Sequence, residues 1–588
     1  MGFIYTRTPL PKHTMSTETT VPNAKRLLWA GFMAILAAGV GFALRGGIIA
    51  NGDWKAAFNF TDSIIGAIAG AGFSGFCFGI IIGGVIVDKI GYGKLVALAL
   101  VGHIVSAFVT FGASTPQNAY DFLYWGMFIF AFANGTLEAV ANPLVATVFP
   151  KQRTHYLNIL HASWPLGMVV GAVASGLLGG GIFGITGLGL SWKYQLSFYL
   201  VPTIAYAVMF FGQSFPKSEA AEKGADLGEM TKDIGILGGA VVCYLLTLFF
   251  AGALGLESMT ANVIGVILLI GTAMISRLIK KPSLESLAAI AVCALIALQA
   301  QSALHLSNTA GLAITIALVM GLGLTMGWTF GSLLLFVLFI THALVGAVEL
   351  GTDGWIEAIT GNIFTPEQGK ILFILTSAIM FGLRFCAHFI ETKLGLSPIG
   401  ILLVSALLAF GGLQLASGMQ GFGVACIALG IYALGKTFFW PTMLAVVGDR
   451  FPRSGAVAMS IMGGIGMLSA GLIGSPGLGY AKDRFTSEFL NATAPAVYAA
   501  NKSATESKFL FLAPVTAVAG DKLEEAKKAG DKGTADQKAI VLANRDGDRA
   551  TLKADSYIPL AMAAIYLLML FYFKSIGGYR ALKLEEQV

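Results

Sequence analysis

The stretch NGTLEAVANP, Asn134 to Pro143, places a carboxylate inside a segment that is apolar enough to cross a bilayer. Asn134, Glu138 and Asn142 recur every four residues, so a helix here carries them as one polar stripe. A charge at mid-bilayer costs roughly 2.5–3.5 kcal/mol on insertion scales. Glu138 is therefore expected to face a cavity or a partner rather than lipid.

The composition of the whole chain indicates a protein that crosses the membrane many times. Hydrophobic residues make up 56% of its 588 residues and charged residues only 12%, against about 25% charged residues in soluble domains. The net charge of +6 sits in short loops, which argues against nucleic-acid binding. The five cysteines lie in apolar runs without the spacing of metal ligands, so we expect neither a metal nor another cofactor.

Runs of about twenty apolar residues, the length that crosses a bilayer, predict an all-α polytopic fold with about sixteen spans. Six runs lie between 27 and 213, four between 234 and 327, five between 332 and 476, and one at about 557–574. The expected parts are a tail (1–26), a first six-helix bundle (27–213), a linker with four inserted spans (214–328), core helices 7–11 (329–476), a polar loop (477–556), and the last core helix with a tail (557–588).

An even number of spans puts both termini on the same side of the bilayer. Basic residues fall in alternate loops, and the positive-inside rule makes that side cytoplasmic. The polar loop at 477–556 is then expected outside the cell. We expect a monomer in the cytoplasmic (inner or plasma) membrane, with no signal peptide in residues 1–25 and with Met1 or Met15 as the start.

An internal repeat relates the two ends of the chain. Glu138 stands five residues before Pro143, and Lys436 stands five residues before Pro441. Each segment leads through a basic loop, FPKQR or FPRSG, into a glycine-rich span. This pattern predicts two six-span halves related by a parallel repeat, with both prolines breaking their helices.

The loop after the second span, GGVIVDKIGYGK from Gly83 to Lys94, resembles the signature G-x-x-x-D-[RK]-x-G-x-[RK] of the major facilitator superfamily. The matching positions, with the final base after Tyr92 and Gly93, are Gly84, Asp88, Lys89, Gly91 and Lys94. The resemblance implies the superfamily fold of two six-helix bundles, here with about four extra helices between them. It also implies that this loop is part of a cytoplasmic gate.

A second stretch, LEAVANPLVATVFPKQRTHYLNILHASWPLG from Leu137 to Gly167, is similar to the fucose, glucose and galactose:proton symporter branch. This resemblance implies that Glu138 binds a proton and that Asn158 and His161 contact the substrate. The chain departs from that branch in its first span, where Arg45 stands instead of an Asn-rich face with an acid.

By analogy with the superfamily, the first, fourth, seventh and tenth core spans line a central cavity. Each carries one ionisable residue, and together these form a neutral ring: Arg45, Glu138, Glu349 and Lys436. We expect Arg45 and Glu349 to form an outer gate, and Glu138 and Lys436 to form a proton-linked centre. The alternative is two static ion pairs that fix the register of the helices.

Polar and aromatic residues of the expected cavity are the candidates for substrate contact: Asn134, Asn142, Asn158, His161, Trp164, Arg384, Phe439 and Trp440. Arg384 is a candidate because arginine is the preferred side chain for anions. A single histidine on an apolar span, such as His103 or His342, is expected to be a core residue with satisfied hydrogen bonds.

The sequence thus predicts a secondary active transporter and not an enzyme. It is expected to move a small polar solute, a sugar by preference, together with protons by alternating access in the lipid bilayer. The alternative within transport is a carrier of organic anions such as a sugar acid, carboxylate or phosphate ester, using Arg45, Arg384 and Lys436. Outside transport, a non-transporting sensor and a multispan membrane enzyme are less favoured, and the largest outer loop has no histidine or cysteine for enzyme chemistry.

Overall fold

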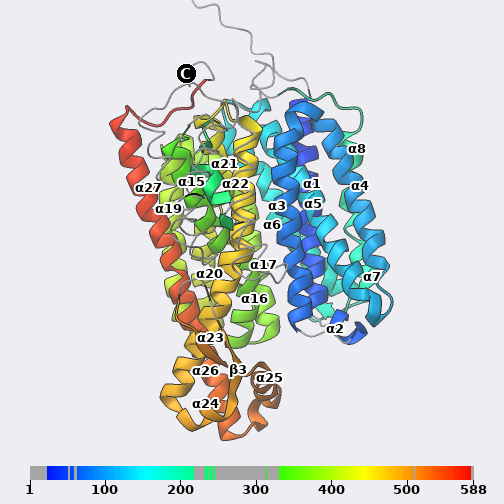
Figure 1. The fold of residues 1–588 in the computed structure, drawn as a ribbon, viewed down its shortest axis with the longest axis vertical. Helices are drawn as coiled ribbons and strands as arrows, with labels where there is room; N and C mark the ends of the chain where they lie inside the picture. The colour runs from blue at the N-terminus through cyan, green and yellow to red at the C-terminus, as the bar shows by residue number, and fades with distance from the viewer. Residues whose placement is uncertain are drawn as a thin grey trace, which may run out of the picture.

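The computed structural model describes residues 23–50, 53–58, 62–217, 232–235, 237–242, 331–507 and 512–583, with isolated positions between these ranges. Long helices that run along one common axis form the body of the molecule (Figure 1). The predicted inserted spans at 260–278 and 286–304 lie outside the described residues, and those at 234–254 and 311–327 lie mostly outside them.

Helices occur at each of the six spans predicted for the first half. They are α1 (Ala24–Ala50), α3 (Asp62–Ile90), α4 (Tyr92–Phe111), α5 (Pro116–Val148), α6 (Arg153–Leu178) and the pair α7 (Trp192–Ser197) and α8 (Leu200–Phe210). A short α2 (Asp53–Phe58) and a hairpin of β1 (Gly181–Ile182) and β2 (Ile185–Thr186) join them. The prediction that Pro143 breaks its helix is wrong, because α5 continues through it; packing against neighbouring helices lets membrane helices tolerate proline.

The second half contains four helix runs that are interrupted and two continuous helices, α19 and α27. They are α15 (Leu333–Gly346), η1 (Ala347–Gly351) and α16 (Thr352–Ile363); α17 (Pro366–Arg384) and α18 (Ala387–Lys393); α19 (Pro398–Ser417); α20 (Phe422–Lys436) and α21 (Phe439–Arg450); α22 (Gly455–Ser469), η2 (Ala470–Gly474) and α23 (Ser475–Thr493); and α27 (Tyr557–Ser575). The turns η1 and η2 are π-helical.

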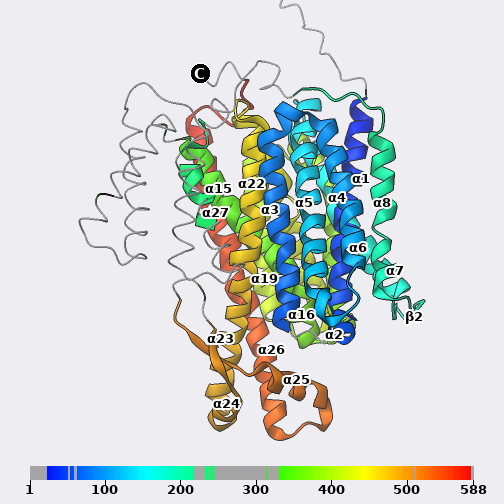
Figure 2. The same cartoon turned by 45° about the vertical axis from the view of Figure 1, so that its right-hand side comes forward.

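Among the described residues, nine helical runs are long and apolar enough to cross a membrane, or ten if the bent pair α17 and α18 counts as one span. The expected total of about sixteen spans is therefore not confirmed. Helix α1 begins and α27 ends at the same end of the bundle (Figure 1). Helices α3 and α22 lie side by side where the two halves meet (Figure 2), with Gly463 and Gly464 packed against Ile80 and Ile81.

The segment predicted as a polar loop is a folded unit at the opposite end of the bundle (Figure 1). After α23 it contains α24 (Pro495–Asn501), an antiparallel hairpin of β3 (Lys502–Ser507) and β4 (Val515–Val518), α25 (Gly520–Ala529), η3 (Gly530–Lys532) and α26 (Ala535–Asp555). The unit is bound to α16: Asn362 donates to Asp548 over 2.9 Å, and Thr352 donates to Asp555 over 2.6 Å.

Close packing between α3 and α5 depends on glycine, and this yields a first prediction. A Cβ atom on Gly79 would overlap the backbone carbonyl of Phe132. We expect Gly79→Ala to destabilise the purified protein by about 1–3 kcal/mol, the usual cost of overpacking, and to lower its melting temperature. Gly382→Ala is the control, because a Cβ there meets nothing within 4 Å. Equal melting temperatures for the two variants would contradict this packing.

Candidate substrate and proton site

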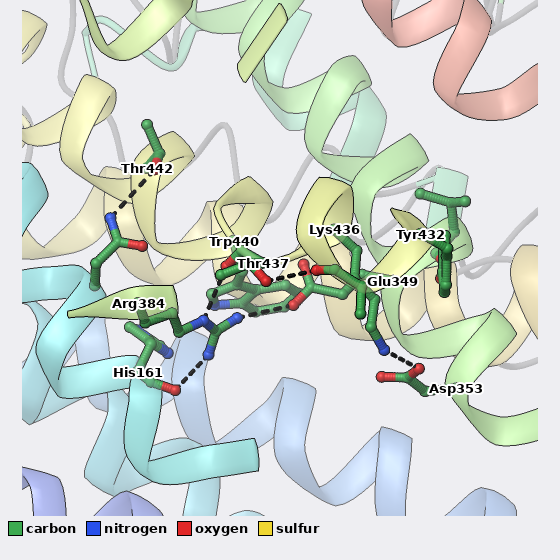
Figure 3. A network of polar contacts seen from close by, with 12 residues as sticks. His161, Glu349, Asp353, Arg384, Tyr432, Lys436, Thr437, Trp440 and Thr442 are labelled. Carbon is green, nitrogen blue, oxygen red and sulfur yellow. Dashed lines mark hydrogen bonds and ion pairs between the residues drawn. The ribbon is translucent and has the colours of Figure 1, made fainter. Parts of the chain in front are cut away.

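Arg384, the last residue of α17, connects the two halves within a network of polar contacts (Figure 3). We call this network and the groups around Glu138 the centre; it includes Glu138, Asn142, His161, Glu349, Asp353, Arg384, Lys436 and Trp440. Arg384 is 2% exposed. Its Nη2 donates to Glu349 Oε1 over 3.1 Å and its Nε donates to the carbonyl oxygen of Thr437 over 2.9 Å. Its Nη1 donates to the carbonyl oxygen of His161, which belongs to α6 of the first half. All three groups of the guanidinium are thus engaged.

Each of the two carbonyl groups that Arg384 binds lies four residues before a proline. Pro165 stands four residues after His161, and Pro441 stands four residues after Thr437. Because proline has no N–H, the carbonyl four residues before it has no partner within the helix. Both released carbonyls accept from Arg384 instead. The signal for this arrangement in the sequence is the spacing in HASWP and TFFWP, where a proline stands four residues after His161 and after Thr437.

Glu138 lies between the halves and is 5% exposed. Its Oε1 accepts a hydrogen bond of 2.9 Å from the indole Nε1 of Trp440 and one of 3.3 Å from Asn142 Nδ2. His161 Nε2 lies 3.9 Å from the same oxygen and 2.7 Å from Asn142 Oδ1. No lysine or arginine of the described residues forms an ion pair with Glu138, since the guanidinium of Arg384 is bonded to Glu349.

The predicted pairing of Glu138 with Lys436 is wrong. Lys436 is fully buried and forms its ion pair with Asp353, a residue that the sequence analysis did not consider (Figure 3). Lys436 Nζ also lies 5.2 Å from the ring centre of Tyr432. Lys436 is the last residue of α20, which ends before Pro441. At this end the side chain of Lys436 meets Asp353 of α16, within the same half, and not Glu138.

The predicted pairing of Arg45 with Glu349 is also wrong. The guanidinium carbon of Arg45 lies 3.8 Å from the ring centre of Phe130 and 4.9 Å from that of Tyr199, inside the first half. The side of α1 that carries Arg45 faces α5 and not the second half. Glu349 lies on the π-helical turn η1, a type of irregularity that is frequent at functional sites.

The candidate residues for substrate contact divide into two groups. Asn134 accepts from His103 over 2.7 Å inside the first half, so it does not join Glu138 at the centre. Asn142, His161, Arg384 and Trp440 meet at the centre, as described above.

Three further candidates flank the centre. Asn158 donates to Thr442 of α21 over 3.3 Å, which joins the halves. Trp164 is half-buried, with its ring centre 5.6 Å from that of Phe42, and Phe439 is fully buried in the core. Among the described residues, no group of three or more histidine, cysteine or acidic side chains is placed to hold a metal ion.

Comparison with known proteins decides the family. Residues 31–348, more than half of the chain, match the model of the Major Facilitator Superfamily. The chain belongs to the Major Facilitator Superfamily. It is therefore a transporter-family protein of the membrane and not an enzyme, as the sequence predicts. No curated protein matches the chain in sequence.

Solved structures of other superfamily members resemble the chain in fold. The human organic anion transporter MFSD10 (TETRAN) aligns with a TM-score of 0.54 and 14% identity over 93% of this chain and 100% of that one. The proton:xylose symporter XylE bound to 6-bromo-6-deoxy-D-glucose aligns with a TM-score of 0.53 and 12% identity over 96% of this chain and 98% of that one. The E. coli fucose:proton symporter FucP aligns with a TM-score of 0.49 and 15% identity over 78% of this chain and 92% of that one.

The superfamily signature lies at the turn between α3 and α4. Gly91 has a φ of 92°, a left-handed conformation that favours glycine, and it directly precedes α4. Gly84 is buried and Lys94 is exposed, while the side chains of Asp88 and Lys89 lie outside the described atoms. The role of this signature as a cytoplasmic gate stays a prediction.

A second set of contacts joins the halves at the end where α1 begins. Arg153 Nη1, at the start of α6, lies 3.4 Å from Asp449 Oδ1 of α21. Tyr579, beyond the end of α27, donates to the same carboxylate over 2.9 Å. Burial and the charge of Asp449 raise the pKa of Tyr579 well above its usual range, so the phenol keeps the proton that it donates.

Proposed function

We propose that this chain is a proton-coupled secondary transporter that carries a small neutral polar solute, a sugar by preference, by alternating access. The charge balance at the centre supports the proposal. Arg384 is paired with Glu349, and Lys436 is paired with Asp353. Glu138 is the carboxylate of this network left without a lysine or arginine partner among the described residues. The centre then has a net charge of −1, and one proton on Glu138 neutralises it.

The groups around Glu138 favour a proton over a metal cation as the coupling ion. Trp440 and Asn142 both present N–H donors to its Oε1. A sodium ion requires several oxygen ligands instead, and the amide oxygen of Asn142 is already bonded to His161. A proton needs only the carboxylate itself. Each proton driven by 100 mV supplies about 2.3 kcal/mol, which sustains a gradient of about fifty-fold.

The contacts of the cations favour a neutral cargo over an organic anion. Arg384 and Lys436, two of the three cations expected to bind an anion, are each neutralised by a carboxylate. Arg45 is the observation that favours the anion carrier, because it is buried without an ion-pair partner among the described residues. It lies inside the first half against Phe130 and Tyr199, however, and does not join Arg384 at the centre.

Uptake competition in proteoliposomes tests the cargo. We expect counterflow of at least one of D-glucose, D-galactose and L-fucose, and we expect an excess of the same neutral hexose to inhibit uptake of its labelled form. D-glucuronate and D-galacturonate have the same ring with a carboxylate and should not compete. Stronger inhibition by the uronic acids than by the hexoses would instead support the anion carrier.

The proposal also includes the arrangement in the membrane. We propose two six-helix halves with four extra spans between them, a monomer in the cytoplasmic membrane, and both termini in the cytoplasm. Arg153 is the first residue of α6, Arg450 is the last residue of α21, and Arg453 lies between α21 and α22. These basic residues gather where helices end, as the positive-inside rule expects on the cytoplasmic side. The folded unit from α23 to α26 is then outside the cell.

A further inference from the structure

His342, in α15, is a fully buried histidine whose hydrogen bonds are not satisfied by the described part of the chain. Neither Nδ1 nor Nε2 of its ring has a hydrogen-bond partner there. Two other buried histidines differ from it. His103 contacts Tyr206 and Asn134 through its two ring nitrogens, and His161 contacts Asn142. The expectation of a satisfied core residue is therefore wrong for His342.

Such a group is costly to maintain in a folded protein. A buried donor or acceptor without a partner costs about 1–3 kcal/mol, and native proteins contain few of them. A neutral imidazole has one hydrogen-bond donor and one acceptor, and in His342 neither has a partner among the described residues. A side chain of this kind is expected where a ligand completes the hydrogen bonds.

The surroundings of His342 place it beside the proposed proton site. Its ring centre lies 4.5 Å from that of Trp440, whose indole donates to Glu138. On another side it is confined by α22, since a Cβ on Gly466 would come within 3.0 Å of its Cδ2 atom. His342 therefore lies where the two halves meet around Trp440.

We propose that His342 binds a hydroxyl-bearing region of the transported solute, and this inference rests on the proposed transport of a neutral sugar. A hydroxyl group both donates and accepts, so the hydroxyls of a hexose complement the N–H and the unprotonated nitrogen of the imidazole. A carboxylate only accepts and would leave the second nitrogen without a partner. His342 thus favours a hydroxyl over a carboxylate at the position of the solute that it contacts.

Counterflow kinetics of His342 variants test the proposal. The probe is whichever of D-glucose, D-galactose and L-fucose the wild type exchanges fastest, with its monodeoxy analogues. We expect His342→Leu to raise KM roughly tenfold with little change in maximal rate, and His342→Gln, which keeps a donor and an acceptor, to restore most of the affinity. One deoxy analogue should bind more weakly than the parent sugar to the wild type and equally well to His342→Leu.

His103→Leu is the matched control, because it makes the same change at a buried histidine whose nitrogens have protein partners. It should reduce the amount of folded protein without changing the preference among the analogues. If His342→Leu does not fold, His342→Asn and His342→Gln replace it; the shorter amide of asparagine should raise KM and that of glutamine should not. A wild-type KM in His342→Leu, or in His342→Asn where the leucine variant does not fold, would overturn the proposal. Failure of the wild type to exchange any of the three hexoses would instead overturn the proposed function.

Discussion

Glutamine in place of Glu138 will abolish proton-driven accumulation of the solute while counterflow of the solute continues. Glutamine keeps an oxygen that accepts from Trp440 and Asn142, so the contacts between the halves persist. It is always neutral, so the centre remains in the charge state that a proton would otherwise produce. The expected accumulation falls from about fifty-fold per 100 mV to no gradient. Labelled solute in energised and in de-energised proteoliposomes gives both quantities.

The control for this variant is Glu488→Gln, which neutralises an exposed acid of α23 whose ion pair among the described residues is with Arg484, one turn away. It should accumulate solute as the wild type does. Accumulation by Glu138→Gln at the wild-type level would contradict a role for Glu138 in coupling. Loss of counterflow in a folded Glu138→Gln protein would also contradict it, because a residue that only carries the proton is not needed for exchange of the solute.

Glutamine in place of Arg384 will have the largest effect on folding and will also abolish transport. The substitution leaves Glu349 buried without its ion-pair partner, which costs about 3–5 kcal/mol. It also leaves the carbonyls of Thr437 and His161 without their donor. We expect a lower melting temperature of the purified protein and no measurable counterflow. Arg384→Lys should be almost as damaging, because an ammonium group cannot reproduce the planar fork of arginine.

The double variant Glu349→Gln/Arg384→Gln separates the two effects. Removing both charges leaves neither member of this ion pair buried and charged without its partner, so most of the lost stability should return. Transport should remain absent, since the connection from Arg384 to α6 of the first half is not restored. Wild-type stability and counterflow in the single Arg384→Gln variant would show that this connection between the halves has no role.

Local patterns in the sequence are sufficient to predict most of the helices of the two halves. Apolar runs of membrane length predict the helices of both halves, and the turn signature at Gly91 identifies the superfamily. The tertiary structure of the segment from 477 to 556 does not follow from the sequence, because its polar composition resembles that of a loop. Its helices pack on one another and bind α16 through Asp548 and Asp555, and these contacts are not apparent from local periodicity.

The central residues were predictable by type but not by partner. Glu138 and Arg384 are candidates because a charged side chain on an apolar span is costly unless it faces a partner or a cavity. Trp440 is a candidate because its aromatic ring can contact a solute. Which cation faces which acid depends on the rotation of each helix and on where it is interrupted. A π-helical turn at Glu349 and a break after Lys436 change that rotation, so the sequence paired Lys436 with the wrong acid.

Two signals in the sequence could have improved the prediction. Asp353 follows Glu349 by four residues, a spacing that places two acids near one face of a helix. The prolines at 165 and 441 each release a carbonyl four residues earlier, and Arg384 binds both. The sequence cannot predict that the ring nitrogens of His342 are without hydrogen-bond partners among the described residues, because this depends on which side chains surround it in the fold.

Solute-driven proton movement tests the central claim most directly. Proteoliposomes that contain a pH-sensitive dye and the wild-type protein are mixed with the hexose that it exchanges fastest, without any imposed potential or pH gradient. We expect the lumen to become acidic as the hexose enters, and Glu138→Gln vesicles to admit labelled hexose without this change. Hexose entry into wild-type vesicles at constant luminal pH would contradict proton coupling at Glu138.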